Sequence, residues 1–327
     1  MREIIGIDAG GSKTSVVHAS FTDSVNTDLQ LIAEADFGAY NYRQDGITAL
    51  HRLIKQILAS FEIEDRRTTL LLGGFAGAGT PKSHEDIQKT FEKHGFRRDL
   101  INIKSDADLL LMAIGNEGIV LTAGTGSMCL GRRKIREDGR EMNVRAGGYG
   151  FRAYSEPGGY QLGMRAIDVA LKIEDGREQE PTVLYTRIKD YFGIANLEEI
   201  IPIIYAPVAT NSHINRQIAG IAKLVLKASH EGDKMANRLV TDVVDNFADH
   251  ILAVYRRLGL ENPLVGLHGG LFADRHGDEL FIKSLMQHAL LKEYQLTFVT
   301  LGTKKGDTDP LREAMKHMVP ENKHLKK

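Results

Sequence analysis

Residues 4–14 read IIGIDAGGSKT, an apolar run that ends in Asp8 and is followed by a pair of glycines. This order predicts a buried strand and a tight turn, because glycine permits positive φ and lets backbone N–H groups approach a ligand. Ser12 and Thr14 add hydroxyl groups, and Asp8 could hold a hydrated Mg²⁺ beside a phosphate. The spacing fits neither the G-x-G-x-x-G motif nor the P-loop motif. A phosphate-binding turn and a plain β-hairpin with a Gly-Gly turn are both open.

Residues 121–127, LTAGTGS, have the same order of an apolar strand followed by small and hydroxyl residues. Two such loops could bind one polyphosphate from both sides of a cleft. Residues 264–272, LVGLHGGLF, end a further strand in Gly269 and Gly270, where an adenine or ribose could lie against bare backbone. A close strand–helix packing turn would explain these two glycines equally well, and His268 is interpreted as a structural histidine.

Residues 104–108, KSDAD, lie where a strand is expected to end before an apolar helix. A carboxylate at this place could accept the proton of a hydroxyl group that attacks a γ-phosphate. Aspartate is also a common helix N-cap. We expect Asp106 to close the strand and Asp108 to enter the helix, so the chemical role is assigned to Asp106 and capping to Asp108.

The chain has 327 residues, with 42 Lys and Arg against 43 Asp and Glu, 33 Gly and one Cys. Its length predicts two domains, and its nearly neutral charge gives no overall attraction to nucleic acid or to an anionic membrane. A single Cys cannot form an intrachain disulfide or by itself hold zinc or an iron–sulfur cluster. The sequence shows no signal peptide and no apolar run long enough to span a bilayer. We therefore expect a soluble, cytoplasmic protein.

Short apolar runs alternate with amphipathic segments, which is typical of an α/β fold. We expect strands over residues 4–8, 15–21, 29–37, 68–74, 101–105, 118–123, 128–133, 264–267 and 295–301. We expect helices over residues 45–61, 81–94, 108–114, 159–173, 182–191, 215–229, 234–258 and 278–291. The strand at 128–133 could pair with 135–136 or with 143–145.

No Pro- or Ser-rich linker separates the two halves, and the best domain boundary lies at residues 114–118. We expect an N-terminal lobe of residues 1–116 and a larger C-terminal lobe of residues 117–307. A helix at about 308–327 is expected to pack back on the N-terminal lobe. Ligands of open α/β folds bind where strand ends meet loops, so the expected site is a cleft between the lobes.

Taken together, these motifs resemble the actin/hexokinase ATPase superfamily. The ordered series is DAGGSKT at 8–14, Asp106, TAGTGS at 122–127 and GGLF at 269–272. More narrowly, the chain is similar to the N-acetylglucosamine kinases of the BadF/BadG/BcrA/BcrD ATPase family. Further matches are GAYNY at 38–42, FAGAG at 75–79 and GGYG at 147–150, so the resemblance covers residues 4–272.

The resemblance implies an α/β, two-lobed fold of duplicated ribonuclease-H-like domains with a cleft between them. It implies an ATP-dependent kinase that phosphorylates an amino sugar at a hydroxyl, O6, with Asp106 as general base and Mg²⁺ held by Asp8 through water. The implied ATP-binding residues are Gly10, Gly11, Ser12, Lys13, Thr14, Thr125, Gly126, Ser127, Gly269 and Gly270. The implied substrate-binding residues are Asn41, Ala78, Gly79, Asp106, Thr125, Gly148, Tyr149, Ser155 and Glu156.

One position departs from the family pattern: Ser155 stands where these kinases carry a sugar-contacting aspartate, while Glu156 is retained. The change leaves the sugar open among N-acetylglucosamine, glucosamine and N-acetylmuramic acid. It also leaves open a nucleotide-gated regulatory or activator ATPase without sugar kinase activity. Because Cys129 is the only cysteine, we expect no iron–sulfur cluster of the activator type. The expected partner is a small-molecule amino sugar, with no nucleic acid and no membrane; a homodimer is left open.

Overall fold

The computed structural model describes residues 1–11, 13–22, 29–137, 139–150, 157–205, 211–302 and 309–319. The chain forms two compact units. Unit 1 consists of Met1–Asn116 together with Thr308–Lys327, and unit 2 consists of Glu117–Asp307. None of the helices in these ranges is both long and apolar enough to cross a membrane.

Unit 1 is built on a five-stranded sheet of order β3-β2-β1-β4-β5. Its strands are β1 (Arg2–Ala9), β2 (Thr14–Phe21), β3 (Gln30–Phe37), β4 (Leu70–Phe75) and β5 (Ile101–Ser105). The first three strands are antiparallel, and β1, β4 and β5 run parallel. The hairpin of β1 and β2 is the one expected from residues 4–14.

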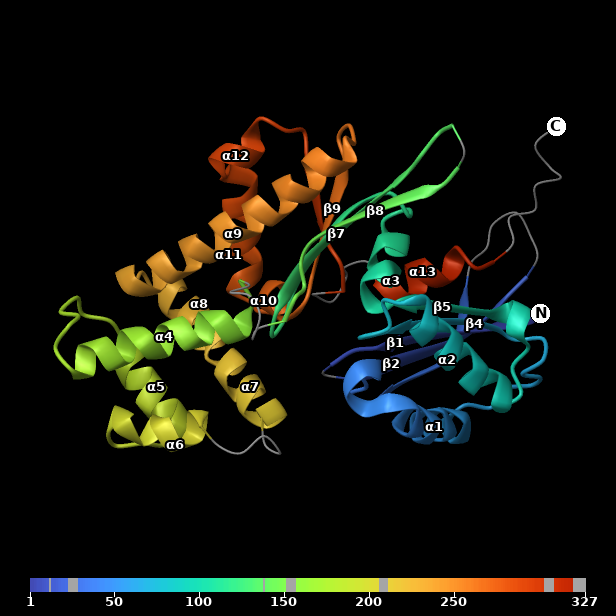
Figure 1. The fold of residues 1–327 in the computed structure, drawn as a ribbon, viewed down its shortest axis with the longest axis horizontal. Helices are drawn as coiled ribbons and strands as arrows, with labels where there is room; N and C mark the ends of the chain where they lie inside the picture. The colour runs from blue at the N-terminus through green and yellow to red at the C-terminus, as the bar shows by residue number, and fades with distance from the viewer. Residues whose placement is uncertain are drawn as a thin grey trace. The chain divides into compact units, whose positions relative to one another are not determined.

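Helices cover both faces of this sheet (Figure 1). They are α1 (Tyr42–Ser60), α2 (Pro81–Lys93), α3 (Asp106–Ala113) and α13 (Pro310–Lys316), with a short 3₁₀ turn at Arg98–Leu100. Ile5 and Ile7 of β1 pack with α1 and α2, whereas Ile4 packs with α3 and α13. Because side chains alternate along a strand, Gly6 and Asp8 share the face of Ile4.

Unit 2 repeats the same sheet, in the order β10-β9-β6-β7-β8. Its strands are β6 (Gly118–Ala123), β7 (Ser127–Lys134), β8 (Glu141–Gly147), β9 (Leu264–His268) and β10 (Thr297–Thr300). The pairs β6–β7 and β7–β8 are antiparallel, and β6–β9 and β9–β10 are parallel. Strands β6 to β10 therefore correspond in order and direction to β1 to β5, and the predicted α/β class with a duplicated core is confirmed.

The two units differ in the helices between the third and fourth strands of each sheet. Unit 1 has only α1 there, while unit 2 has a large helical insertion that shares one apolar core with its sheet. The insertion comprises α4 (Gly159–Glu174), α5 (Leu184–Phe192), a 3₁₀ turn at Leu197–Glu199, α6 (Ile200–Ile204), α7 (Asn211–Gly220), α8 (Ala222–His230) and α9 (Lys234–Leu258). The remaining helices are α10 (Gly270–Ala273), α11 (Gly277–Gln287) and α12 (Ala289–Lys292).

The structure corrects two details of the expected elements and decides a third that was left open. Helix α3 begins at Asp106 rather than at residue 108, because the Ser105 hydroxyl caps it. The helices expected at 215–229 and 278–291 are each two helices, α7 with α8 and α11 with α12. Of the two partners considered for 128–133, β7 takes the later one, residues 141–147 of β8.

Candidate functional site

Two of the predicted carboxylates lie at the same end of the unit 1 sheet. Asp8 is aligned with Gly74 of β4, and Gly74 is aligned with Lys104 of β5, two residues before Asp106. A side chain on Gly74 would collide with Leu109, so the glycine allows α3 to pack closely on β4. This packing fixes the first turn of α3, and with it Asp106, beside the carboxyl end of β1.

Asp106 is the first residue of α3. Its Oδ1 accepts the N–H of Ala107 at 3.0 Å, and its side chain is half-buried. The expected N-cap role of Asp108 is wrong in detail: Ser105 is the cap, and its hydroxyl accepts the N–H of Asp108 at 3.2 Å. Asp108 is the second member of this capping box, because its carboxylate accepts from the N–H and the hydroxyl of Ser105.

A third carboxylate, which the sequence did not reveal, acts on Asp8 from the C-terminal segment. Burial, then the negative charge of Asp106, then that of Asp309 raise the pKa of Asp8 to about 7, while Lys13 lowers it. Asp309 is the N-cap of α13, and its Oδ1 accepts the N–H groups of Leu311 and Arg312 at 3.0 and 3.1 Å. The Asp-Pro pair at 309–310 is a helix-start signal, but nothing in it indicates a neighbour 300 positions away along the chain.

The chemistry of this carboxylate group fits a hydrated Mg²⁺. Within the described residues the Asp8 carboxylate accepts no hydrogen bond, and a divalent cation would remove the repulsion that raises its pKa. In the same part of the chain, no three His, Cys, Asp or Glu side chains lie close enough together to hold a metal directly. Mg²⁺ commonly keeps several waters and binds through one or two carboxylates and the substrate phosphates. This agrees with an Asp8 carboxylate that accepts no hydrogen bond and with the lack of three converging ligands among the described residues.

The first glycine turn is closed by its own backbone. The N–H of Gly10 donates to the carbonyl of Lys13 at 2.9 Å. The Thr14 side chain is fully buried and donates to the carbonyl of Gly38 at 2.8 Å, and the Lys13 ammonium pairs with Asp36 at 2.8 Å. Ser12 lies outside the described residues. Gly11 is exposed, and a Cβ built on it would meet nothing within 4 Å, so the packing around it does not require glycine.

Two groups of predicted sugar-binding residues are adjacent in unit 1. Asn41 forms a parallel bridge with Ala76, and its Oδ1 accepts the N–H of Arg43 at 3.0 Å as the cap of α1. Gly77 has φ of +78°, and a Cβ on it would lie 2.5 Å from the Asn41 Oδ1. Ala78 is fully buried, whereas Gly79 is exposed. The structure thus brings Asn41 and the 76–79 loop together.

The second glycine turn, in unit 2, rests on the start of α4. The N–H of Gly124 donates to the carbonyl of Gly126 at 2.9 Å. The N–H groups of Gly159 and Tyr160 donate to the carbonyls of Gly124 and Thr125 at 2.8 and 2.9 Å. A Cβ on Gly158 would lie 2.5 Å from Cα of Gly126. Gly158 and Gly159 therefore position this loop, a role that the sequence analysis missed although the pair lies at the start of a predicted helix.

Ser127 carries a buried hydroxyl with no partner. The residue is 4% exposed, and its Oγ has no hydrogen bond within the described part of the chain. The next residue, Met128, is aligned with Gly147 of β8, which places the turn of Gly148 and Tyr149 beside Ser127. Tyr149 is 61% exposed. Buried hydroxyls are seldom left without a hydrogen bond, so Ser127 is a natural contact for a polar ligand.

The two glycines after β9 differ in what they do. Gly269 has φ of +114°, and a Cβ there would lie 2.5 Å from the carbonyl oxygen of Ala123, so close packing explains it. Gly270 is exposed, and a Cβ there would meet nothing within 4 Å. His268 bonds the carbonyl of Leu301 through Nδ1 at 2.7 Å, which is a structural contact. Ser155 and Glu156 lie outside the described residues.

Cys129 is fully buried on β7, where it is aligned with Leu121 of β6. Burial raises the pKa of its thiol well above the usual range. A buried neutral thiol behaves as a small apolar core side chain. The expectation that the protein holds no iron–sulfur cluster stays a prediction.

The model of the BadF/BadG/BcrA/BcrD ATPase family matches residues 5–293. The N-acetylmuramic acid/N-acetylglucosamine kinase of Clostridium acetobutylicum is 29% identical over 273 residues, 82% of this chain and 84% of that protein. The N-acetyl-D-glucosamine kinase of Dictyostelium discoideum is 24% identical over 305 residues, 87% of this chain and 90% of that protein. The resemblance indicated by the motifs is confirmed.

A solved structure from Chromobacterium violaceum, described provisionally as an N-acetylglucosamine kinase, has a TM-score of 0.68 and 18% identity to this chain. The superposition covers 97% of this chain and 99% of that one. At this identity the likeness shows the fold, and the predicted actin/hexokinase-like fold class is confirmed.

Proposed function

The chain belongs to the BadF/BadG/BcrA/BcrD ATPase family, and from this premise we propose that it is an ATP-dependent kinase that phosphorylates an amino sugar. Two curated relatives are named as kinases of N-acetylglucosamine, one of them also of N-acetylmuramic acid. The observation that carries the proposal is the repeated sheet. Each copy places a glycine-containing turn at the same point, between its first strand and the antiparallel partner of that strand.

We assign both turns to the phosphates of ATP. Backbone N–H groups of residues 11–14 and 125–127 would donate to phosphate oxygens, while the Gly10 N–H closes the first turn, and the buried Ser127 hydroxyl would gain the partner it lacks. Gly269 and Gly270 would lie against the adenosine. Asp8 would hold Mg²⁺ through water, and the ion would supply positive charge to the phosphates. In this assignment the Thr14 side chain supports the turn through Gly38.

Asp106 would act as the general base. The O6 hydroxyl oxygen of the sugar attacks the γ-phosphorus while its proton passes to the Asp106 carboxylate. The bond from the γ-phosphorus to the bridging oxygen breaks, and ADP leaves. The half-buried position of Asp106 on a capped first turn supports this role, because the carboxylate is held in place without being sealed in the core.

We assign the sugar to Asn41, the backbone of the 76–79 loop, and the turn of Gly148 and Tyr149. Ser155 and Glu156 follow that turn along the chain and complete the proposed set. A serine in place of a carboxylate changes which sugar hydroxyls the site can bind strongly. The sugar is therefore to be chosen by experiment among N-acetylglucosamine, glucosamine and N-acetylmuramic acid.

The test is a coupled assay of ADP release with each of these sugars in turn, and also with N-acetylmannosamine and with glucose. The product is identified by mass spectrometry. We expect ADP release to depend on one or a few amino sugars and to match a phosphosugar product. Hydrolysis that is indifferent to every sugar would favour the regulatory ATPase instead.

Asp106→Asn should lower turnover by roughly 10²- to 10⁴-fold and leave ATP affinity within about twofold. Asp108→Asn is the matched control, since it makes the same change of charge in the same helical turn at a capping position. The control should lose some stability and keep its turnover. An Asp106→Asn enzyme with full turnover would reject Asp106 as the base.

A further inference from the structure

Helix α13 lies on the face of the unit 1 sheet that carries Asp8. Gly6 of β1, Val17 of β2 and Glu34 of β3 are aligned in one row across the strands. A side chain on Gly6 would collide with Met315 and Leu311, so the glycine allows α13 to pack directly on β1. Asp8 is two residues farther along β1 and points to the same side. Leu311, two residues after Asp309, thus lies over the β1 position two residues before Asp8, which brings the N-cap of α13 close enough for its charge to act on the Asp8 carboxyl.

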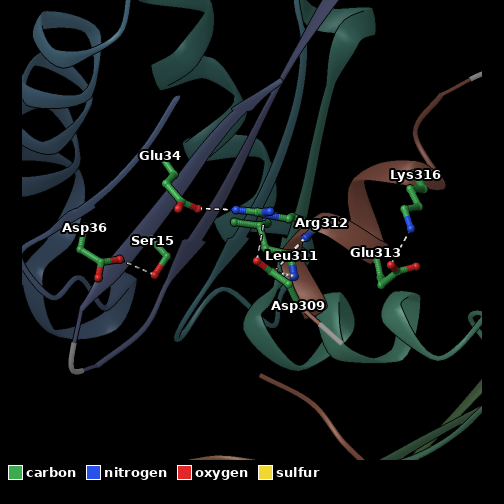
Figure 2. A network of polar contacts seen from close by, with 8 residues as sticks. All are labelled: Ser15, Glu34, Asp36, Asp309, Leu311, Arg312, Glu313 and Lys316. Atoms are coloured by element: carbon green, nitrogen blue, oxygen red, sulfur yellow. Dashed lines mark hydrogen bonds and ion pairs between the residues drawn. The ribbon is translucent and has the colours of Figure 1, made fainter. Parts of the chain in front are cut away.

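Arg312 fixes the start of α13 to the edge of the sheet. Its Nη2 contacts Glu34 Oε2 at 2.5 Å, and its Nε lies 3.2 Å from Asp309 Oδ2 (Figure 2). Since Asp309 Oδ1 accepts two backbone N–H groups, both oxygens of this carboxylate are restrained. Arg312 thus holds the helix against β3 and the Asp309 side chain against the helix.

Around Asp8, negatively charged side chains outnumber positively charged ones. Asp8, Ser15 and Asp36 are aligned, and Asp36 accepts from Ser15 at 2.7 Å and from the Lys13 ammonium at 2.8 Å. Lys13 lowers the pKa of Asp8, but its ammonium is already paired with Asp36. Asp106 and Asp309 act on Asp8 with two further negative charges, which no cation among the described residues offsets as an ion pair of Asp8.

We propose that Asp309 is a third carboxylate of the Mg²⁺–nucleotide site at Asp8, and that Arg312 is its positioning residue. The inference rests on the proposed function, since it assigns a further residue to the same site. Asp309 would act on the hydrated ion by its charge and through water, since in the described part of the chain no three acidic side chains converge to coordinate a metal directly.

The test variant is Asp309→Asn in the full-length chain. Asparagine keeps an oxygen that can accept the N–H groups of Leu311 and Arg312, so the helix cap is retained while the charge is lost. Glu313→Gln is the matched control. It removes the same charge from the same helix, but Glu313 pairs with Lys316 and does not act on Asp8. Unfolding temperatures of both variants check that each is folded.

The measurement is the Kd of ADP by calorimetry, in excess Mg²⁺ and in chelator. For Asp309→Asn we expect the gain in affinity that Mg²⁺ provides to fall on the order of fivefold, from the loss of one charge near a divalent ion. Without Mg²⁺, ADP should bind this variant as tightly as the wild type or more tightly, because less negative charge faces the phosphates. Arg312→Gln should also lower the gain in ADP affinity that Mg²⁺ provides, whereas Glu313→Gln should leave it unchanged.

A merely structural role for Asp309 would weaken ADP binding equally with and without Mg²⁺, and that result would overturn the inference. An unchanged Mg²⁺ gain in Asp309→Asn would overturn it as well, and either result leaves the kinase proposal intact. A wild-type protein whose ADP affinity does not respond to Mg²⁺ would overturn both the proposed function and this assignment.

Discussion

At the scale of single residues, Asp8 has the clearest conflict between stability and its proposed role. Burial and the charges of Asp106 and Asp309 raise its folded-state pKa from 3.8 to about 7. In the unfolded chain the same carboxyl ionises near pH 4. Between these values the folded state holds the proton more tightly, so stability falls as pH rises through this window, and the cost is complete above about pH 7.

Asp8→Asn should therefore stabilise the nucleotide-free protein at pH 8, on the order of 2–4 kcal/mol, and by about half as much or less near pH 5, where the wild-type carboxyl is still protonated in the folded state. Urea unfolding of both proteins at the two pH values measures this difference. Asp36→Asn is the contrasting control: hydrogen bonds from Lys13, then Ser15, lower the pKa of Asp36, so its ionised form is favoured in the fold. Asp36→Asn should therefore destabilise the folded protein at pH 8, because it removes this favoured charge. If Asp8→Asn raised the free energy of unfolding equally at pH 5 and pH 8, the raised pKa of Asp8 would be contradicted.

Of the two glycines after β9, Gly269 is required for packing, whereas Gly270 is not and is therefore available for a role in binding. Gly269→Ala should destabilise unit 2 by about 2 kcal/mol or more, because it combines positive φ with a clash against the Ala123 carbonyl. Gly270→Ala meets no atom within 4 Å and should leave stability within about 0.5 kcal/mol.

If adenosine lies against this turn, Gly270→Ala should weaken ATP binding at least several-fold while the unfolding temperature is unchanged. Calorimetric titration with a non-hydrolysable ATP analogue, beside a thermal melt, measures both quantities. If Gly270→Ala binds the ATP analogue as tightly as the wild type, this turn does not contact adenosine, and only the packing role of Gly269 remains.

At the scale of elements, the sequence predicted most strands because their apolar runs are short and end at glycines or polar residues. Residues 101–105 and 118–123 became β5 and β6 with the expected bounds, and 234–258 became α9. The start of α3 was misplaced because Ser105 and the two aspartates after it are all good caps, and only the observed hydrogen bonds choose Ser105. The partner of β7 was left open because a hairpin signal does not fix loop length.

What the sequence could not predict depends on contacts between distant segments. The break between α7 and α8 lies where α4 packs closely, since a side chain on Gly163 would collide with the carbonyl of Ile218. The effect of Asp309 on Asp8 requires the position of α13, which no local pattern specifies. The candidate site is therefore predictable where a motif and a strand end coincide, as at Asp8, and hidden where a tertiary contact supplies the residue.

The contact of α13 with β1 gives a prediction about Gly6. Gly6→Ala should destabilise unit 1 by about 1–3 kcal/mol, because the added methyl displaces Met315 and Leu311. Met315→Ala leaves a cavity at the same place, which the Gly6→Ala methyl can partly fill. In a double-mutant cycle by urea unfolding, the two changes together should cost less than their sum by about 1 kcal/mol or more. Additivity within about 0.5 kcal/mol would show that the two positions do not touch.

At the scale of the whole molecule, the two copies of the sheet are completed differently. Unit 2 is one continuous segment with a single large core. Unit 1 needs both ends of the chain, because its second core joins residues of β1, β2 and α3 to Leu311, Ala314, Met315 and Val319. The segment that carries Asp309 is thus also part of the core that holds β1, so placing this carboxylate and folding unit 1 depend on the same contacts.

Removal of residues 309–327 should therefore unfold or loosen unit 1 and spare unit 2. The truncation exposes Ile4, Val17 and Leu109 and removes the buried side chains that pack on them, a loss of several kcal/mol and comparable with the whole stability of a domain. Hydrogen exchange followed by mass spectrometry should show much faster exchange in β1, β2 and α3 and unchanged protection in α9 and β6. A full-length Leu311→Ala, Met315→Ala double variant should show the same pattern more weakly. Unchanged protection of β1 in the truncated chain would mean that unit 1 is complete without α13, and the C-terminal segment would then have no structural reason to be held beside Asp8.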